Sequence, residues 1–117
     1  MSKVLVVDDE PGIRQFVTIA LEGEGFEVAS AANGQLAVDA AAEDRPDLVV
    51  LDMMLPRLDG QQVAEQIRRI HGDVPFLLIT ADVRPQEKAD RVGAFAFLSK
   101  PFDVAELLAV VCRRLQS

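Results

Sequence analysis

Five short apolar runs alternate with segments of helical periodicity from one end of the chain to the other. All but the second run are nearly continuous in apolar character, which is typical of strands that are covered on both faces. A strand covered on one face would instead alternate between apolar and polar residues. The runs are KVLVV (3–7), EVAS (27–30), DLVVL (47–51), PFLLI (75–79) and AFAFL (94–98).

The segments between these runs repeat apolar residues at the 3.6-residue spacing of an amphipathic helix. Asn33 and Asp103 precede two of them and are of residue types that cap helix N-termini. The segment 85–92 is the weakest helix, because it is short and mostly polar. The other helices are expected at residues 12–24, 34–43, 60–70 and after Asp103, with inward stripes that include Phe16, Val17, Leu21, Leu36, Ala37, Ala41, Val63, Ile67, Ile70, Leu107 and Val111.

Strict alternation of strands and helices, joined by short loops, predicts right-handed βαβ units and a parallel sheet with helices on both faces. Five of each in 117 residues fit an α/β, flavodoxin-like (βα)5 three-layer sandwich with a parallel five-stranded sheet of order 2-1-3-4-5. The length suits one hydrophobic core, so we expect residues 1–117 to form a single domain.

Composition excludes several classes of protein. The formal net charge is −7, and an acidic domain repels phosphate backbones, so we expect no direct binding of nucleic acid. Cys112 is the single cysteine, so no internal disulfide can form and a reducing compartment fits. The N-terminal apolar run is too short for a signal peptide, and no run approaches membrane-spanning length. We therefore expect a soluble cytoplasmic protein with no membrane partner.

Polar residues follow four of the five apolar runs directly. In a parallel sheet these strand ends lie along one edge, and ligands bind where the strand order changes direction, here between the first and third strands. The second run ends in alanines and Asn33. The polar strand ends are Asp8, Asp9 and Glu10 after the first run, Asp52 after the third, Thr80 after the fourth, and Ser99, Lys100 and Pro101 after the fifth.

The residue types at this edge suit a phosphoryl group and a divalent metal. Carboxylates from neighbouring strands repel one another unless a cation lies between them, and hard oxygen ligands suit Mg²⁺ beside a phosphate. Lys100 adds a point charge for one phosphate oxygen, and Thr80 adds a hydroxyl donor. Asp52 is a carboxylate that can form an aspartyl phosphate. Each residue alone is more typical of a turn, a helix cap or the surface. Their joint placement at one edge of the sheet is what favours a site for a phosphoryl group and a metal.

Several separated motifs resemble the receiver domain of two-component response regulators. The resemblance covers Lys3 to Leu115, with the motifs in the family's order. It implies a phosphorylation switch that catalyses only its own phosphorylation and dephosphorylation. The motifs are VVDDEPGIR (6–14), VVLDMMLPRLDG (49–60), LLITA (77–81) and GAFAFLSKPF (93–102).

By this resemblance Asp52 is the phosphoacceptor, and its donor is a sensor histidine kinase or a histidine phosphotransfer protein. Asp9 would ligate Mg²⁺ directly and Asp8 mainly through water. Asp52 and the Met54 backbone carbonyl would complete the protein ligands, and Mn²⁺ could replace Mg²⁺. Only the main chain of Met54 is then required, which accommodates its apolar side chain.

The same resemblance assigns further residues of the site. Thr80 and Lys100 would contact the phosphoryl group. Phe97 falls at the family's switch aromatic, which turns inward when the threonine moves toward the phosphate; its alternative role is simple core packing in a strand. The bond between Lys100 and Pro101 resembles the family's cis peptide, a conformation that is otherwise rare even before proline.

The expected partners follow from the resemblance as well. Arg14 and Phe102 flank the site, from the first helix and from the loop before the last helix, and are candidates for docking the kinase. Output would come from binding a downstream protein that the sequence does not identify, or from an effector domain absent from this chain. We expect a monomer or a weak dimer.

Two departures from the family pattern affect the expected output surface. The stretch from Thr80 to Gly93 is shorter than usual by about half a helical turn, so the helix at 85–92 is short. Phe95 stands where many DNA-binding members carry an acidic residue that forms a salt bridge across a dimer, which argues against their activated dimer. Phe95 is then either an exposed apolar contact or a filler of space left by the short helix.

Three other functions fit parts of the pattern. A phosphatase of the haloacid dehalogenase type also uses a strand-end aspartate, but it carries a second one two residues later, where this chain has Met54. A flavodoxin-like cofactor binder would need a Ser/Thr-rich phosphate loop and stacking aromatics, whereas this chain has Asp8 and Asp9 and neither Trp nor Tyr. A degenerate receiver that only binds proteins would lack the acceptor or the acids, and none of these is missing.

Overall fold

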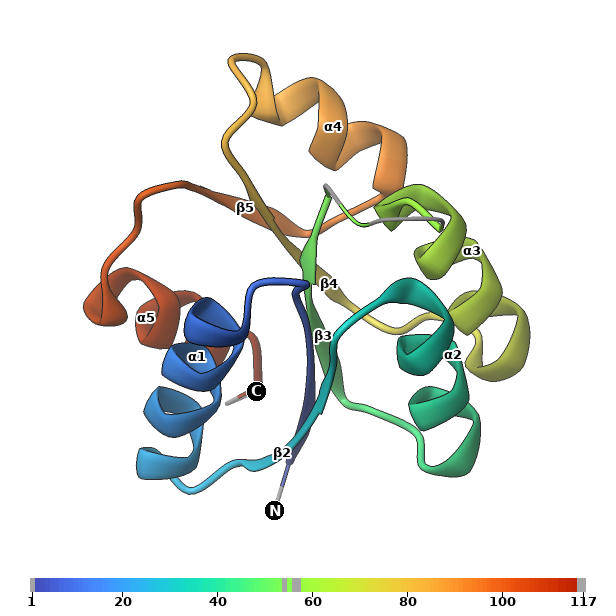
Figure 1. Cartoon of the computed structure of the whole chain (residues 1–117), viewed down its shortest axis with the longest axis horizontal. Helices are drawn as coiled ribbons and strands as arrows, with labels where there is room; N and C mark the ends of the chain where they lie inside the picture. The colour runs from blue at the N-terminus through green and yellow to red at the C-terminus, as the bar shows by residue number, and fades with distance from the viewer. Residues whose placement is uncertain (1, 54, 56–57, 116–117) are drawn as a thin grey trace.

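Five parallel strands form one sheet, and helices pack on both of its faces in the computed structural model (Figure 1). The structure describes residues 2–53, 55 and 58–115. The strand order is β2-β1-β3-β4-β5, which confirms the predicted order and the flavodoxin-like fold. The strands are β1 (Lys3–Val7), β2 (Glu27–Ala31), β3 (Leu48–Asp52), β4 (Phe76–Thr80) and β5 (Ala96–Ser99). The helices are α1 (Pro11–Gly23), α2 (Gly34–Glu43), α3 (Gly60–His71), α4 (Pro85–Val92) and α5 (Val104–Leu115).

The register of the sheet aligns the carboxyl ends of its central strands. Val7 pairs with Leu51, so the end of β1 lies beside the end of β3. Asp52 pairs with Ile79, which brings the last residue of β3 next to the end of β4. The residues that directly follow these strands therefore meet at one edge of the sheet, as the alternation of elements predicts.

The sheet separates two hydrophobic cores, because successive side chains of a strand point to opposite faces. One core lies under α2, α3 and α4, and the other lies under α1 and α5. Every residue of β3 and β4 is buried, as expected for strands that are covered on both faces. Phe97 packs against the first core and Phe102 against the second, although they are close in sequence.

The helices α2, α3 and α5 each begin directly after a residue whose side chain caps the helix. The Asn33 side chain accepts a hydrogen bond from the Leu36 backbone N–H at 2.9 Å, and Asp103 accepts one from Glu106 at 2.8 Å. α3 begins with a capping box formed by Asp59 and its third helical residue. None of the helices in the described part of the chain is long and apolar enough to cross a membrane.

α4 is held at its end by a side chain from α3. Arg68 donates hydrogen bonds to the backbone carbonyls of Val92 and Gly93, the second at 3.0 Å, while its guanidinium lies 4.7 Å from the centre of the Phe76 ring. These carbonyls have no partner within the helix, so an arginine is a favourable cap for them. The predicted short helix at 85–92 is confirmed, and this contact compensates for its few apolar residues.

Some sequence expectations differ from the structure in detail. Phe16, Leu36 and Ile70, expected to face the core, are 43%, 50% and 45% exposed. They lie at the margins of their helical stripes, and smaller residues such as Ala37 make the contact of α2 with the sheet. β5 begins at Ala96 rather than residue 94, and Asp52 and Thr80 are the last residues of their strands rather than the first residues after them.

Candidate functional site

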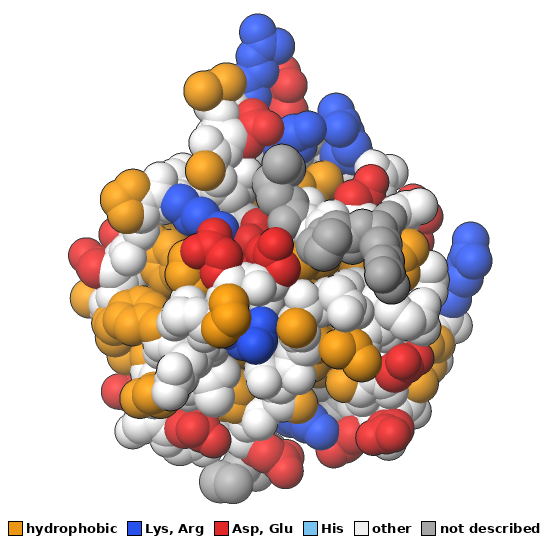
Figure 2. All heavy atoms as spheres, viewed as in Figure 1, with side chains coloured by type: hydrophobic (Ala, Val, Ile, Leu, Met, Phe, Trp, Pro, Cys, Tyr) orange, Lys and Arg blue, Asp and Glu red, His pale blue; other side chains and the backbone are white. Residues whose placement is uncertain are grey.

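Polar side chains gather where β1, β3, β4 and β5 end. Figure 2 shows a group of acidic side chains near the middle of this face, close to the connection from β1 to α1 in Figure 1. Among the described residues, the buried side chains that are polar or charged are Asp8, Asp52 and Thr80, each at most 2% exposed. Burial of polar groups costs free energy unless they are paired, so their concentration at one edge indicates a site rather than chance.

Asp52 and Lys100 form the central contact of this site. Lys100 Nζ donates a hydrogen bond to Asp52 Oδ2 at 2.9 Å and lies 3.8 Å from Glu10 Oε1. Its backbone N–H donates to the Thr80 carbonyl at 2.8 Å, which fixes Lys100 at the end of β4. Burial lowers the pKa of Lys100, but the hydrogen bond and the carboxylates around it outweigh burial and raise the pKa above its usual value. The raised pKa keeps the lysine charged at neutral pH.

The side chains of Asp8, Asp9 and Glu10, here called the acidic cluster, offer carboxylate oxygens that lie within 4.8 Å of one another. Burial raises the pKa of Asp8 from 3.8 to about 6. A hydrogen bond from the Glu10 backbone N–H lowers this pKa, and the charge of Asp52 raises it further. Closely spaced hard oxygen donors, one of them costly to ionise without a cation, fit a divalent metal such as Mg²⁺.

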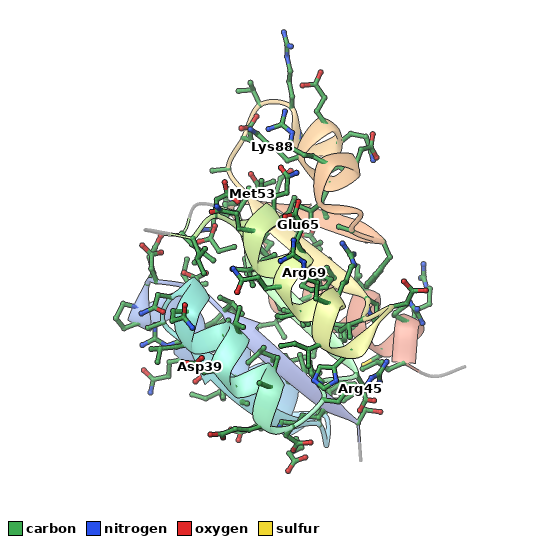
Figure 3. The ribbon with its side chains drawn as sticks, turned by 90° about the vertical axis from the view of Figure 1, so that its right-hand side faces the viewer. Asp39, Arg45, Met53, Glu65, Arg69 and Lys88 are labelled. Carbon is green, nitrogen blue, oxygen red and sulfur yellow. The ribbon has the colours of Figure 1, made fainter. Side chains whose placement is uncertain are left out.

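The Thr80 hydroxyl is oriented by the loop that follows β4. Its Oγ1 accepts a hydrogen bond from the Asp82 backbone N–H at 3.0 Å. This contact uses a lone pair and leaves the hydroxyl hydrogen to be donated elsewhere. Thr80 also lines a cleft of about 420 Å³ between α4 and the start of α3. Figure 3 shows Met53 and Lys88, which border this cleft, close together beyond the start of α3.

Comparison with known proteins identifies the family. Residues 4–112 match the family model of the response regulator receiver domain. The chain belongs to this family. The receiver is 43% identical over 109 residues to the response regulator MprA of Mycolicibacterium vanbaalenii, and this match covers 92% of the chain but 47% of MprA. The receiver thus spans about half the length of the curated relative it matches.

Solved structures agree with this family and with its fold. The chemotaxis response regulator CheY4 of Vibrio cholerae is similar, with a TM-score of 0.90 and 35% identity over 98% of this chain and 99% of that one. The receiver domain of the Pseudomonas aeruginosa sensor histidine kinase PA1611 has a TM-score of 0.89 and 30% identity, over 99% of this chain and 98% of that one. It is described with a magnesium ion coordinated in its active-site cleft.

Phe102, one of the two residues predicted to dock a kinase, borders a second hollow of the receiver. Phe102 lies against Phe16, with ring centres 6.4 Å apart, and these rings line a hollow of about 410 Å³ together with Ile13 and Lys100. Arg14 is half-buried, and its Nη1 donates to the Asp8 backbone carbonyl at 2.8 Å. Arg14 therefore supports the loop that carries the acidic cluster, a contact that the sequence did not predict.

The structure brings together most residues that the sequence assigned to the site. Asp8, Asp9, Asp52, Thr80 and Lys100 lie at one edge, as predicted. The peptide bond before Pro101 is cis, as expected, and Phe97 is half-buried. Met54 lies outside the described residues. Glu10 was given no role from the sequence, although its position directly after the acidic pair was a usable signal for its contact with Lys100.

Proposed function

We propose that residues 1–117 form one receiver domain that acts as a phosphorylation switch, with Asp52 as the phosphoacceptor. A sensor histidine kinase or a histidine phosphotransfer protein would be the donor. The observation that carries this proposal is the buried Asp52 carboxylate, which is in contact with the Lys100 ammonium and next to the acidic cluster. A carboxylate at this depth that touches a fixed cation is arranged to act as a nucleophile toward an anionic group.

The proposed reaction is a transfer between two side chains. A carboxylate oxygen of Asp52 forms a bond to phosphorus while the bond from phosphorus to the donor's histidine nitrogen breaks. The imidazole nitrogen keeps the bonding electron pair, so a ring whose other nitrogen already carries a proton leaves as neutral imidazole. Lys100 would neutralise charge on one phosphoryl oxygen, and the Thr80 hydroxyl, already oriented by Asp82, would donate a hydrogen bond to another.

A divalent cation belongs to this proposal because of the donor set. Asp8, Asp9 and Asp52 would hold Mg²⁺, or Mn²⁺ in its place, and Glu10 offers a further carboxylate oxygen within 4.8 Å of those of Asp8 and Asp9. The predicted contribution of the Met54 carbonyl stays a proposal. When bound, the ion supplies positive charge that offsets the charge on the phosphoryl oxygens. Without it, the acidic cluster repels an approaching phosphoryl group.

The switch would pass from Thr80 to β5. Phe97 pairs with Leu78 of β4 and packs, half-buried, against the core under α2, α3 and α4. A hydrogen bond from Thr80 to a phosphoryl group would pull on the loop to Asp82 and open room for the Phe97 ring to turn inward. Phosphorylation would thereby shift the equilibrium between the present position of the Phe97 ring and an inward one.

Partners would use different faces of the receiver. We propose that the donor protein covers the hollow lined by Phe16 and Phe102, because this hollow opens beside Lys100. Arg14 would act there by holding the loop of the acidic cluster. We propose a monomer or weak dimer in the cytoplasm that signals to a downstream protein without itself contacting nucleic acid.

The acceptor assignment is tested by treating the protein with acetyl phosphate and Mg²⁺ and measuring the intact mass. The parent and an Asp39→Asn control, altered at an exposed carboxylate on α2, should each gain one phosphoryl group. Asp52→Ala should gain none, and equal labelling of this variant would refute the assignment. We also propose that the receiver turns over no outside substrate, so steady phosphate release from a generic phosphomonoester would contradict that part.

A further inference from the structure

Arg14 lies beside the acidic cluster and yet forms no ion pair with it. Within the described part of the chain, none of the ion pairs includes Arg14. The half-buried side chain instead directs its Nη1 to the main-chain carbonyl of Asp8, at 2.8 Å. A cation so near the amino end of α1 gains nothing from the helix dipole, which favours cations at the other end. The contact with the Asp8 carbonyl is therefore the interaction that accounts for an arginine at this position.

This contact restrains the peptide group between Asp8 and Asp9. A peptide group is planar, so a hydrogen bond to its oxygen restrains the orientation of the whole group. The next peptide group is held as well, because the Glu10 backbone N–H donates to Asp8 Oδ1 at 2.9 Å. The bond from Cα to Cβ of Asp9 leaves the main chain between these two planes. Their orientation therefore sets the direction of the Asp9 side chain.

Asp9 depends on this backbone more than its two neighbours in the acidic cluster do. The Asp8 carboxylate accepts the hydrogen bond from the Glu10 N–H, and the Glu10 carboxylate lies 3.8 Å from Lys100 Nζ. Over the residues that the structure describes, the exposed Asp9 carboxylate has no hydrogen bond or ion pair of its own. An oxygen of Asp9 nevertheless lies within 4.8 Å of those of Asp8 and Glu10. Its place in the cluster therefore rests on the two peptide groups beside it, and Arg14 holds one of them.

We propose that Arg14 is a positioning residue for the divalent cation of the receiver. By holding the peptide group between Asp8 and Asp9, it would keep the carboxylates of both residues directed at one ion. Arg14 would not touch the ion, and its bond to a main-chain carbonyl leaves both carboxylates available as ligands. This inference rests on the proposed cation site, and it gives Arg14 a role inside the receiver that needs no contact with a kinase.

The charge of Arg14 and its hydrogen bond act on the cation in opposite directions. A guanidinium repels a divalent ion, so removing its charge alone would tighten binding of the ion. Losing the bond to the Asp8 carbonyl frees the peptide group, and ordering it again on binding costs conformational entropy, which weakens binding. Solvent screens the charge of the half-buried guanidinium. We expect orientation to prevail, because groups that orient metal ligands change the affinity by about 10- to 100-fold.

The test is a titration of the whole, unphosphorylated chain with Mn²⁺, in which the free ion is followed by electron paramagnetic resonance. Arg14→Met removes the donor and the charge and keeps a long apolar side chain, and we expect it to raise the Kd for Mn²⁺ about tenfold. Arg14→Lys keeps a donor and the charge, so its Kd should fall between those of the parent and of Arg14→Met. The matched control is Arg69→Met, which makes the same change of charge at an exposed arginine directed outward from α3 (Figure 3). Its Kd should stay within about twofold of the parent's.

A purely structural role for Arg14 predicts a different result. In that case Arg14→Met would lower the free energy of unfolding, measured with urea in EDTA, but the folded variant would bind Mn²⁺ as the parent does. We expect the Kd to rise under conditions where the ¹⁵N amide spectrum shows that the variant is folded. If Arg14→Met did not fold, Arg14→Gln would supply the same comparison, because its shorter side chain does not reach the Asp8 carbonyl.

Three results would overturn the proposal. A Kd of Arg14→Met equal to or below that of the parent would show that the bond to the Asp8 carbonyl does not set the affinity. A Kd of Arg14→Lys as high as that of Arg14→Met would show that a donor at this position makes no difference. A parent that binds no Mn²⁺ would refute the cation site of the proposed function and the role of Arg14 with it, whereas the first two results would leave that site intact.

Discussion

Replacing Asp8 by Asn should stabilise the metal-free protein at neutral pH. Asp8 is 2% exposed, and burial raises its pKa from 3.8 to about 6. The folded state therefore holds the proton more tightly than the unfolded chain does, and stability falls as the pH rises from about 4 to above 6. Asn resembles the protonated acid in size and keeps an oxygen that can accept the 2.9 Å hydrogen bond from the Glu10 backbone N–H.

The magnitude follows from the two pKa values. The step from 3.8 to about 6 corresponds to about 3 kcal/mol at 1.36 kcal/mol per pH unit. Water reaches the acidic cluster on the side of Asp9 and Glu10, which are exposed. This water lowers the free-energy cost of ionising Asp8. We expect Asp8→Asn to raise the free energy of unfolding by about 1–3 kcal/mol at pH 8 and by almost nothing below pH 4.

Urea denaturation of both proteins in EDTA, at pH values from 4 to 8, measures this difference. The two stability curves should meet at low pH and separate as the pH rises through about 6. Added Mg²⁺ should reduce the difference in free energy of unfolding, because it stabilises the parent more than the variant. At a Mg²⁺ concentration tenfold above the Kd of the parent for this ion, the parent gains about 1.4 kcal/mol. Curves that stay parallel at every pH would refute the reasoning, since no cost would then be tied to ionisation of Asp8.

Three further changes test other contacts. Lys100→Met removes the cation 2.9 Å from Asp52 and should slow labelling by acetyl phosphate about 100-fold, as followed by intact mass against time. Arg68→Met removes the cap of α4 and should cost about 1–2 kcal/mol in urea denaturation, with faster hydrogen exchange confined to α4; unchanged exchange there would contradict the capping role. Gly34→Ala would place a methyl group 2.6 Å from the Leu58 Cβ atom and should cost about 1–3 kcal/mol, whereas the control Gly12→Ala meets nothing within 4 Å and should be neutral or stabilising.

Much of the fold could be predicted because its signals are local. Continuous apolar runs such as the one before Asp52 are typical of strands buried on both faces, and β3 is buried throughout. Asn33 and Asp103 have side chains that satisfy helix N–H groups, and both act as caps. The exposure of Leu36 could not be predicted in this way, because it depends on how closely α2 approaches the sheet and α3.

The site was predictable to the extent that backbone topology positions it. Residues at the ends of adjacent parallel strands meet whatever their side chains do, so Asp52, Thr80 and Lys100 could be grouped from the sequence. Contacts made by long side chains were not predictable. The reach of Arg14 to the Asp8 carbonyl and the approach of Glu10 to Lys100 depend on rotamers that periodicity does not specify.

Phe97 and Phe102 are separated by the thickness of the sheet, although only four residues lie between them in the chain. One ring belongs to the layer of α2, α3 and α4, and the other to the layer of α1 and α5. Under the proposed roles, in which Phe102 docks the donor protein and Phe97 moves in the response, substitutions beside Phe102 would alter recognition of the donor without disturbing the packing around Phe97. Two copies of such a gene would then be free to acquire different donors while both kept the same response.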